Sequence, residues 1–255
     1  VYCGDKIDIW EFLFTQYGME TITAFFLLFA SVITIIFSIM LGLIYHTKFD
    51  MEYLGWCMLM GSIWMLGESK FRQLLVPHSS ALATLCFIIL MLSPLPVLFY
   101  ADQVQHRKYR RLYLPIGWLA IFNFIISTIL HLTGIADYIE TLFVSHTILL
   151  LTVFVVLFTF ALDIKKEKKH RNLLAFTGLL AATISVMIEG ISTYFVVSLS
   201  GIFVGIGMMI LFSLNVLRTA ENIHMMELRR QKKELAKRKR QIEKVSLQIC
   251  LLYTS

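Results

Sequence analysis

The chain has 255 residues, of which 58% are hydrophobic and 16% are charged, and its formal net charge is +6. An average soluble domain has about 25% charged residues, and a soluble protein of this length would need more polar surface to cover its core. The composition therefore excludes an ordinary soluble protein and predicts an all-α membrane protein in contact with a lipid bilayer.

The first 20 residues precede the first apolar stretch and do not form a signal peptide. They begin without Met, carry four acidic residues, and have neither a basic start nor a small-residue cleavage site. We therefore expect residues 1–20 to be the extracellular end of an outer domain that precedes Val1 in a longer protein.

Seven apolar stretches follow, and each is a candidate membrane helix. A spanning helix needs about 20 mostly apolar residues to cross a hydrocarbon core about 30 Å thick. The predicted spans cover residues 21–45, 52–67, 81–100, 114–133, 141–162, 173–196 and 199–217. The second is the shortest, the third should kink at Pro94 and Pro96, and a very tight turn at 197–200 joins the last two. A seven-helix domain is therefore predicted over residues 21–217.

The basic residues lie on alternate connections between these stretches. If the chain crosses the membrane seven times, all but three of its 23 Lys and Arg residues fall on one side, the exceptions being Lys6, Lys70 and Arg72. Cytoplasmic connections carry the excess of Lys and Arg in membrane proteins. The distribution therefore predicts an extracellular N-terminus and a cytoplasmic C-terminus, and it accounts for the positive net charge without nucleic acid.

Residues 218–248 differ abruptly from the spans and are rich in residues that favour helices. Leu228, Leu235 and Ile242 recur every seven residues. Leu214 has the same spacing, which Glu221 interrupts, and a second heptad seam beside it is mostly polar. Such a heptad predicts a weak parallel coiled coil, so we expect a homodimer through this signalling helix. A single solvated helix with lysines attracted to anionic lipid is the alternative. The segment lacks the interleaved aromatic residues of a nucleic-acid platform.

Residues 249–255 do not continue this pattern. The sequence from Cys250 to Ser255 resembles the translated start of a sequencing adapter. We therefore expect the last seven residues to be non-native and the natural protein to continue beyond Gln248.

Four ionisable residues lie at predicted membrane depth, where such groups are rare and usually functional or paired. They are Glu68, His131, His146 and Glu189. Glu189 is the deepest carboxylate and could be protonated, or pair with His146 if their helices face each other. The four are candidates for an outward-facing ligand or proton site. The alternative is interhelical hydrogen bonding, worth roughly 1 kcal/mol per contact.

No sequence motif assigns a reaction. The four cysteines share no disulfide or metal spacing, and P-loop, zinc-hydrolase and nucleophile-elbow motifs are absent. We therefore expect no catalytic residue, cofactor or metal site in these 255 residues. Gly201, Gly205 and Gly207 include a Gly-x-x-x-Gly pattern, which permits close helix packing.

Several short tracts resemble one bacterial group, the seven-transmembrane receptors with diverse intracellular signalling modules. They are WMLGESKFRQLL at 64–75, LSPLP at 92–96, LTGIAD at 132–137, His146, and LRTAE at 217–221. The resemblance covers residues 21–248 and includes no catalytic signature.

The resemblance implies a sensor in the bacterial plasma (inner) membrane that links an unknown extracellular ligand to a cytoplasmic output domain. Residues 241–248 are similar to linkers that precede HD-type phosphodiesterases. We therefore expect an HD-GYP cyclic di-GMP phosphodiesterase or a GGDEF diguanylate cyclase to follow, and any enzyme activity would belong to that domain. A histidine kinase, a small membrane transporter or channel, and a membrane-embedded enzyme are the alternatives.

Overall fold

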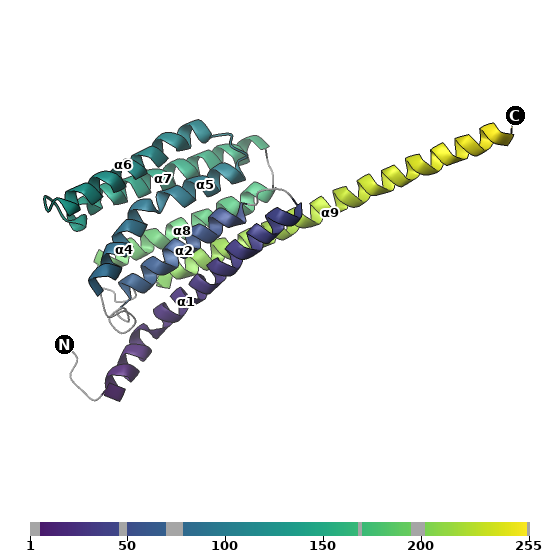
Figure 1. Ribbon diagram of the computed structural model, residues 1–255. Helices are drawn as coiled ribbons and strands as arrows, with labels where there is room; N and C mark the ends of the chain where they lie inside the picture. Colours follow the sequence, from purple (N-terminus) through teal and green to yellow (C-terminus); the bar gives the residue numbers. More distant parts are fainter. Residues whose placement is uncertain (1–5, 46–49, 70–78, 168–169, 195–201, 254–255) are drawn as a thin grey trace. The chain divides into compact units, whose positions relative to one another are not determined.

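A computed structural model describes residues 6–45, 50–69, 79–167, 170–194 and 202–253, and these ranges contain helices and turns but no strand. The helices are α1 (Lys6–Tyr45), α2 (Met51–Glu68), α4 (Ser79–Leu92), α5 (Pro94–Val104), α6 (Arg110–Leu132), α7 (Tyr138–Glu167), α8 (His170–Tyr194) and α9 (Ile202–Tyr253) (Figure 1). The predicted all-α class is confirmed. The predicted turn at 197–200, Gly201, Lys70 and Arg72 lie outside the described residues.

Within the described ranges, five helical segments are long and apolar enough to cross a membrane. They are Gly18–Tyr45, Ala81–Val104, Arg110–Leu132, Tyr138–Ile164 and Ile202–Glu243. They overlap five of the seven predicted spans, although the last continues beyond the predicted end at residue 217. Large apolar side chains such as Leu43 (70% exposed) and Phe143 (80% exposed) cover their outer surfaces, as expected of a surface that faces lipid. The chain therefore has the helices of a multi-pass membrane protein. The apolar segment of α8, Leu173–Glu189, is shorter, and α2 is not among the five.

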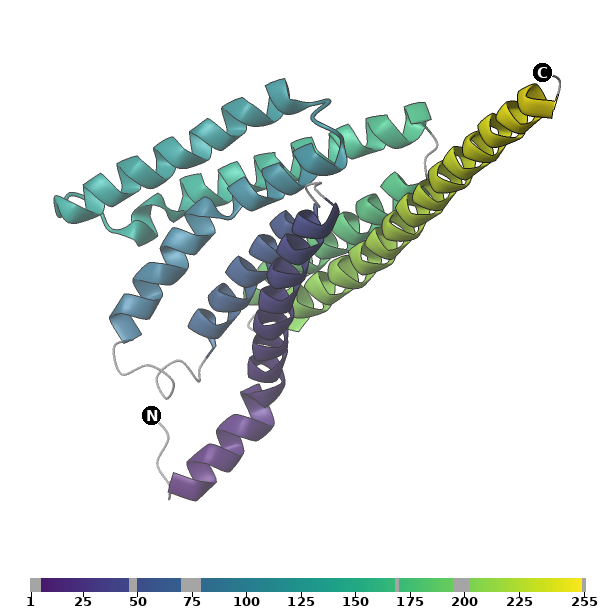
Figure 2. The same ribbon diagram turned by 45° about the vertical axis from the view of Figure 1, so that its right-hand side comes forward.

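The chain divides into two compact units within α9, Val1–Asn215 and Val216–Ser255. In the first unit, α1 packs along α2, α2 contacts α4 and α5, and α5, α6 and α7 contact one another (Figure 2). Its core contains the fully buried side chains of Leu27, Leu54, Met58, Tyr100 and Phe160. The second unit is the remainder of α9.

The span formed by α4 and α5 is broken at Ser93, immediately before Pro94 and Pro96. The Ser93 N–H still donates to the Ile89 carbonyl at 2.8 Å, but proline has no N–H to donate and its ring disfavours a straight helix. The two helices accordingly run in different directions (Figure 2). The predicted kink is confirmed.

The start of α9 lies close to two neighbouring helices because it carries glycines. A Cβ on Gly205 would lie 2.6 Å from Thr23 Cγ2 of α1, and a Cβ on Gly207 would lie 2.6 Å from Ser185 Cβ of α8. The Cβ on Gly207 would also lie 3.0 Å from the backbone Cα of Ala182. The predicted close packing at these glycines is therefore confirmed.

Candidate functional site

The connection between α5 and α6 is a tight turn with two consecutive left-handed residues. His106 has φ = 52° and Arg107 has φ = 62°, a conformation that costs a residue with a Cβ roughly 1–2 kcal/mol. Backbone hydrogen bonds fix the turn: the Arg107 N–H donates to the Asp102 carbonyl at 2.8 Å, and the Lys108 N–H to the Gln105 carbonyl at 3.2 Å. Such a strained turn persists only where its surroundings hold it.

A buried polar network holds this turn against α7. The Tyr113 hydroxyl donates to Gln105 Oε1 at 2.5 Å and lies 2.5 Å from Thr159 Oγ1. Gln105 Nε2 also donates to Thr159 Oγ1 at 3.3 Å. All three side chains are at most 4% exposed, so their mutual hydrogen bonds replace those that water would make.

An ion pair makes a second connection one turn further along α7. Lys108 Nζ lies 2.5 Å from Asp163 Oδ1, and the Tyr109 hydroxyl donates to the same oxygen at 3.3 Å. The Asp163 side chain is 3% exposed and that of Lys108 is 38% exposed. A nearly buried carboxylate is therefore neutralised by the residue that follows the left-handed turn.

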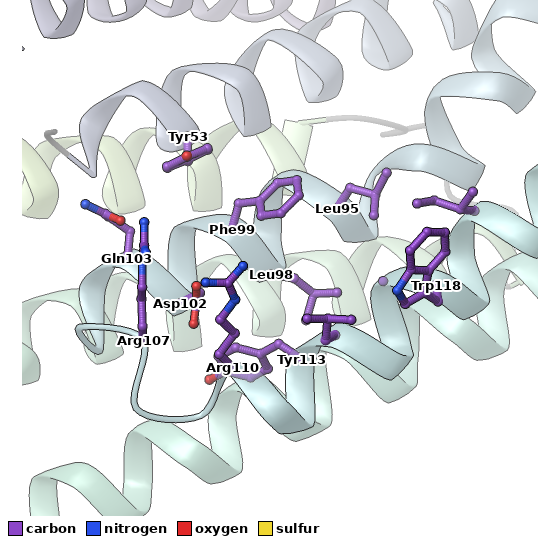
Figure 3. Close-up of a pocket in the computed structure, with 13 residues that line it drawn as sticks. Tyr53, Leu95, Leu98, Phe99, Asp102, Gln103, Arg107, Arg110, Tyr113 and Trp118 are labelled. Atoms are coloured by element: carbon purple, nitrogen blue, oxygen red, sulfur yellow. The ribbon is translucent and has the colours of Figure 1, made fainter.

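A pocket of about 400 Å³ lies between α2, α5 and α6, next to the turn (Figure 3). Its polar lining residues include Asp102, Gln103, Arg107 and Arg110. Its apolar lining residues include Leu95, Leu98, Leu114, Trp118 and Ile121. Tyr53 of α2 contributes its ring, 5.7 Å from the ring of Phe99.

The lining of the pocket includes one carboxylate, Asp102, and two guanidinium groups, Arg107 and Arg110. Each guanidinium is a fixed fork of N–H donors that matches an anionic group with two or more oxygens. The arrangement can therefore bind an anion that carries an apolar portion.

The predicted site residues on α6 and α7 have different surroundings. His131 Nδ1 lies 3.3 Å from Asp137 Oδ1, and the His131 ring stacks on Tyr138 with centroids 4.2 Å apart. His146 is exposed, and its Nδ1 lies 3.0 Å from the Leu142 carbonyl oxygen of its own helix.

The two predicted glutamates also differ in burial. Glu68 is exposed at the last residue of α2, whereas Glu189 is 5% exposed on α8. The structure therefore distributes the four predicted residues over four helices. In the second unit, the predicted seam residues Leu228, Leu235 and Ile242 are 39%, 58% and 68% exposed.

Sequence reasoning missed the polar network at the other end of the bundle. The fifth span was predicted to end at residue 162, which would leave Asp163 in a connection. Instead α7 continues to Glu167, so Asp163 is on the helix and nearly buried. The sequence did contain a signal for this network. Thr159 and Asp163 are four residues apart and so share one face of a helix, and both lie near the membrane side on which the basic connection with Lys108 is predicted.

No group of three or more His, Cys, Asp and Glu residues within the described ranges could hold a metal ion. The side chains of Cys57 and Cys86 are buried. A scan of protein-family models and searches of curated proteins and of solved structures find no significant match to this chain. The class that fold and site define is thus a helical multi-pass membrane protein with an arginine-lined pocket, and the receptor resemblance stays a prediction.

Proposed function

We propose that this chain is the membrane sensor of a bacterial signalling protein, in which α9 relays an extracellular stimulus to a cytoplasmic output domain. The observation that carries the proposal is the continuity of α9 from Ile202 to Tyr253. Its first part packs through Gly205 and Gly207, and residues 228–243 are exposed and rich in charged side chains. Because each helical N–H bonds to the carbonyl four residues earlier, rotation of the first part is passed along the helix.

In this proposal α2 and α8 also cross the membrane, which gives seven spans. The 18 residues of α2 would measure about 27 Å at 1.5 Å per residue, close to the roughly 30 Å of a hydrocarbon core. Leu54, Met58 and Met65 are buried against neighbouring helices. This burial supports α2 as a membrane span although α2 is not among the five most apolar segments. With seven spans the connections that carry most of the Lys and Arg residues face the cytoplasm, which places the N-terminus outside and the C-terminus inside.

The exposed seam supports a homodimer through residues 218–248. Leu228, Leu235 and Ile242 are large apolar side chains at a seven-residue spacing on a charged helix. Two parallel helices would bury these side chains against each other. A partly polar seam makes the pairing weak, so a stimulus can change its register.

The output domain we propose is an HD-GYP cyclic di-GMP phosphodiesterase or a GGDEF diguanylate cyclase, with a histidine kinase as the alternative. The support is the similarity of residues 241–248 to linkers that precede such domains. Reading the source DNA beyond the codon for Gln248 tests this choice directly. A coding region for one of these domains would support it, and an immediate stop codon would exclude it.

The relay itself is tested by joining residues 1–248 to a diguanylate cyclase whose activity can be measured in cells. One to seven alanines are inserted at the junction. We expect the activity to change with the length of the insertion and to return near the original value at seven, because seven residues restore the heptad register. Activity independent of insertion length would contradict a relay through α9.

A membrane transporter or channel is the second candidate, favoured by one observation. Glu189 is a carboxylate only 5% exposed within an apolar helical segment, and such residues often mark ion or proton pathways. The test compares ion and solute flux in liposomes that contain the original protein or Glu189→Gln. A flux that the substitution abolishes supports transport, whereas a sensor gives no flux with either protein.

A further inference from the structure

The pocket between α2, α5 and α6 changes from polar to apolar along its length. Asp102, Arg107 and Arg110 lie together at one end, whereas Leu95 and Trp118 lie at the other (Figure 3). Two candidate membrane spans meet at the polar end, since one ends just before the turn and the next begins at Arg110. In a bilayer, the polar end would therefore lie at head-group depth and the apolar end among the acyl chains.

We propose that this pocket binds an anionic phospholipid whose head group carries a hydrogen-bond donor, as phosphatidylglycerol does. Arg107 and Arg110 bind the phosphate, Asp102 accepts a hydrogen bond from the head-group hydroxyl, and one acyl chain follows the apolar lining. The site is separate from the signal relay and does not depend on it.

The charges at the polar end favour a lipid with one net negative charge. Two guanidinium groups face one carboxylate, and both arginines are near enough to Asp102 to interact with it electrostatically. One positive charge is therefore in excess. Guanidinium groups bind phosphate oxygens bidentately, so the phosphodiester is the natural partner for that excess.

The carboxylate explains why the head group also needs a donor. Asp102 lines the pocket with a half-buried side chain. Its Oδ1 accepts no hydrogen bond from the residues that the structure describes, and an ionised carboxylate only accepts hydrogen bonds, so a ligand that brings a donor suits this wall of the pocket. A glycerol head group brings hydroxyl donors, whereas a choline head group brings none.

The apolar lining has the length and the space for an acyl chain. From Arg110 to Ile121 the helix α6 rises about 16 Å at 1.5 Å per residue. Gly117 lies between these two residues, and a Cβ there would be 3.7 Å from Leu95 Cδ2 and 3.8 Å from Leu98 Cδ1. The missing side chain at Gly117 therefore leaves a groove, and a larger residue would fill it.

The test is a titration of the purified full chain in detergent with phosphatidylglycerol, followed by native mass spectrometry, with phosphatidylcholine as the reference lipid. We expect the original protein to prefer phosphatidylglycerol. The double variant Arg107→Asn/Arg110→Gln should bind it about tenfold more weakly or worse. Arg111→Gln is the matched control, because this arginine belongs to the same basic segment but does not line the pocket, and its affinity should be unchanged.

Gly117→Leu gives a second variant that tests the acyl-chain groove without removing charge. It should weaken phosphatidylglycerol and phosphatidylcholine alike, while thermal unfolding in detergent confirms that the variant is folded. Leucine favours helices more than glycine does, so the substitution should not lower helix stability.

Three results would overturn the proposal. The first is equal affinity in the double arginine variant and the original protein. The second is an equal loss in Arg111→Gln, which would indicate attraction to the basic segment as a whole. The third is competition by acyl-free glycerophosphoglycerol as strong as by the intact lipid, which would indicate a soluble anion instead.

Discussion

Lys108 Nζ lies 2.5 Å from Asp163 Oδ1 and so joins the α5–α6 turn to the last turns of α7. The Asp163 side chain is 3% exposed, and the Tyr109 hydroxyl is its second donor, at 3.3 Å. Removing one member of a nearly buried ion pair leaves the other without compensation. This contact, together with the Tyr113 network, accounts for the persistence of a turn that holds two left-handed residues.

Lys108→Met should lower the free energy of unfolding by about 3 kcal/mol. This is the lower end of the range for breaking a buried pair, because Lys108 itself is 38% exposed. Unfolding in detergent by added denaturant measures the change. Changing Asp163 to Leu as well should restore much of the stability, since no lone charge is then buried. Arg111→Met is the control, and equal stability of Lys108→Met and this control would contradict the prediction.

Tyr113→Phe should lower the free energy of unfolding by about 1–2 kcal/mol, because it removes a hydroxyl that two buried partners share. Those partners are Gln105 and Thr159. The ring of residue 113 still lines the pocket in the variant, so phosphatidylglycerol affinity should be kept. Tyr53→Phe removes a hydroxyl at the wall of the same pocket, outside this network, and should leave stability unchanged. Equal thermal shifts for the two variants would show that the network does not stabilise the fold.

Gly207→Ala should destabilise the bundle by about 1–3 kcal/mol, as overpacking does. The new Cβ would lie 2.6 Å from Ser185 Cβ and 3.0 Å from the Ala182 Cα, and backbone atoms cannot rotate away. Gly18→Ala makes the same change in α1, where the nearest atoms belong to the Phe14 ring at 3.5 Å. It should be neutral, or more stable by about 0.5–1 kcal/mol from helix propensity. The melting temperatures of Gly207→Ala and Gly18→Ala, measured in the same detergent, test this prediction.

The sequence predicts the apolar helices of this fold well and its polar contacts poorly, for a physical reason. Hydropathy is local, so five spans and the break before Pro94 can be read from neighbouring residues. The network of Gln105, Tyr113 and Thr159 joins side chains up to 54 residues apart, and only packing brings them together. Asp163 directly follows the predicted fifth span, 141–162, so the sequence pattern places it in a connection. Lys108, which lies in a different connection, neutralises the buried Asp163. The residues next to Asp163 in the sequence do not indicate that this lysine lies nearby.

Substitutions at Arg107 distinguish the effect of backbone strain in the turn from the effect of charge in the pocket. Its φ of 62° suits asparagine, which enters the left-handed region several times more often than most residues, and opposes a β-branched residue. Arg107→Asn should therefore equal or slightly exceed the original stability, while Arg107→Val should lose about 1 kcal/mol. Both variants remove the same charge, so their phosphatidylglycerol affinities should fall together. A difference in lipid affinity as large as the difference in stability would show that the turn, rather than the guanidinium, controls binding.

Leu235 should approach the same residue of a second copy if the helix 218–248 dimerises. In a background in which Cys3 and Cys250 are serine, Leu235→Cys in membranes should form an intermolecular disulfide under mild oxidation. Lys237→Cys is the matched control, since two residues rotate a helix position by about 200°. Cys57 and Cys86 are buried and should not cross-link. A disulfide at Leu235→Cys alone supports the parallel seam, because in a parallel pair the same position meets itself. Equal cross-linking at both positions would indicate random collision, and a solvated single helix would then fit better than a coiled coil.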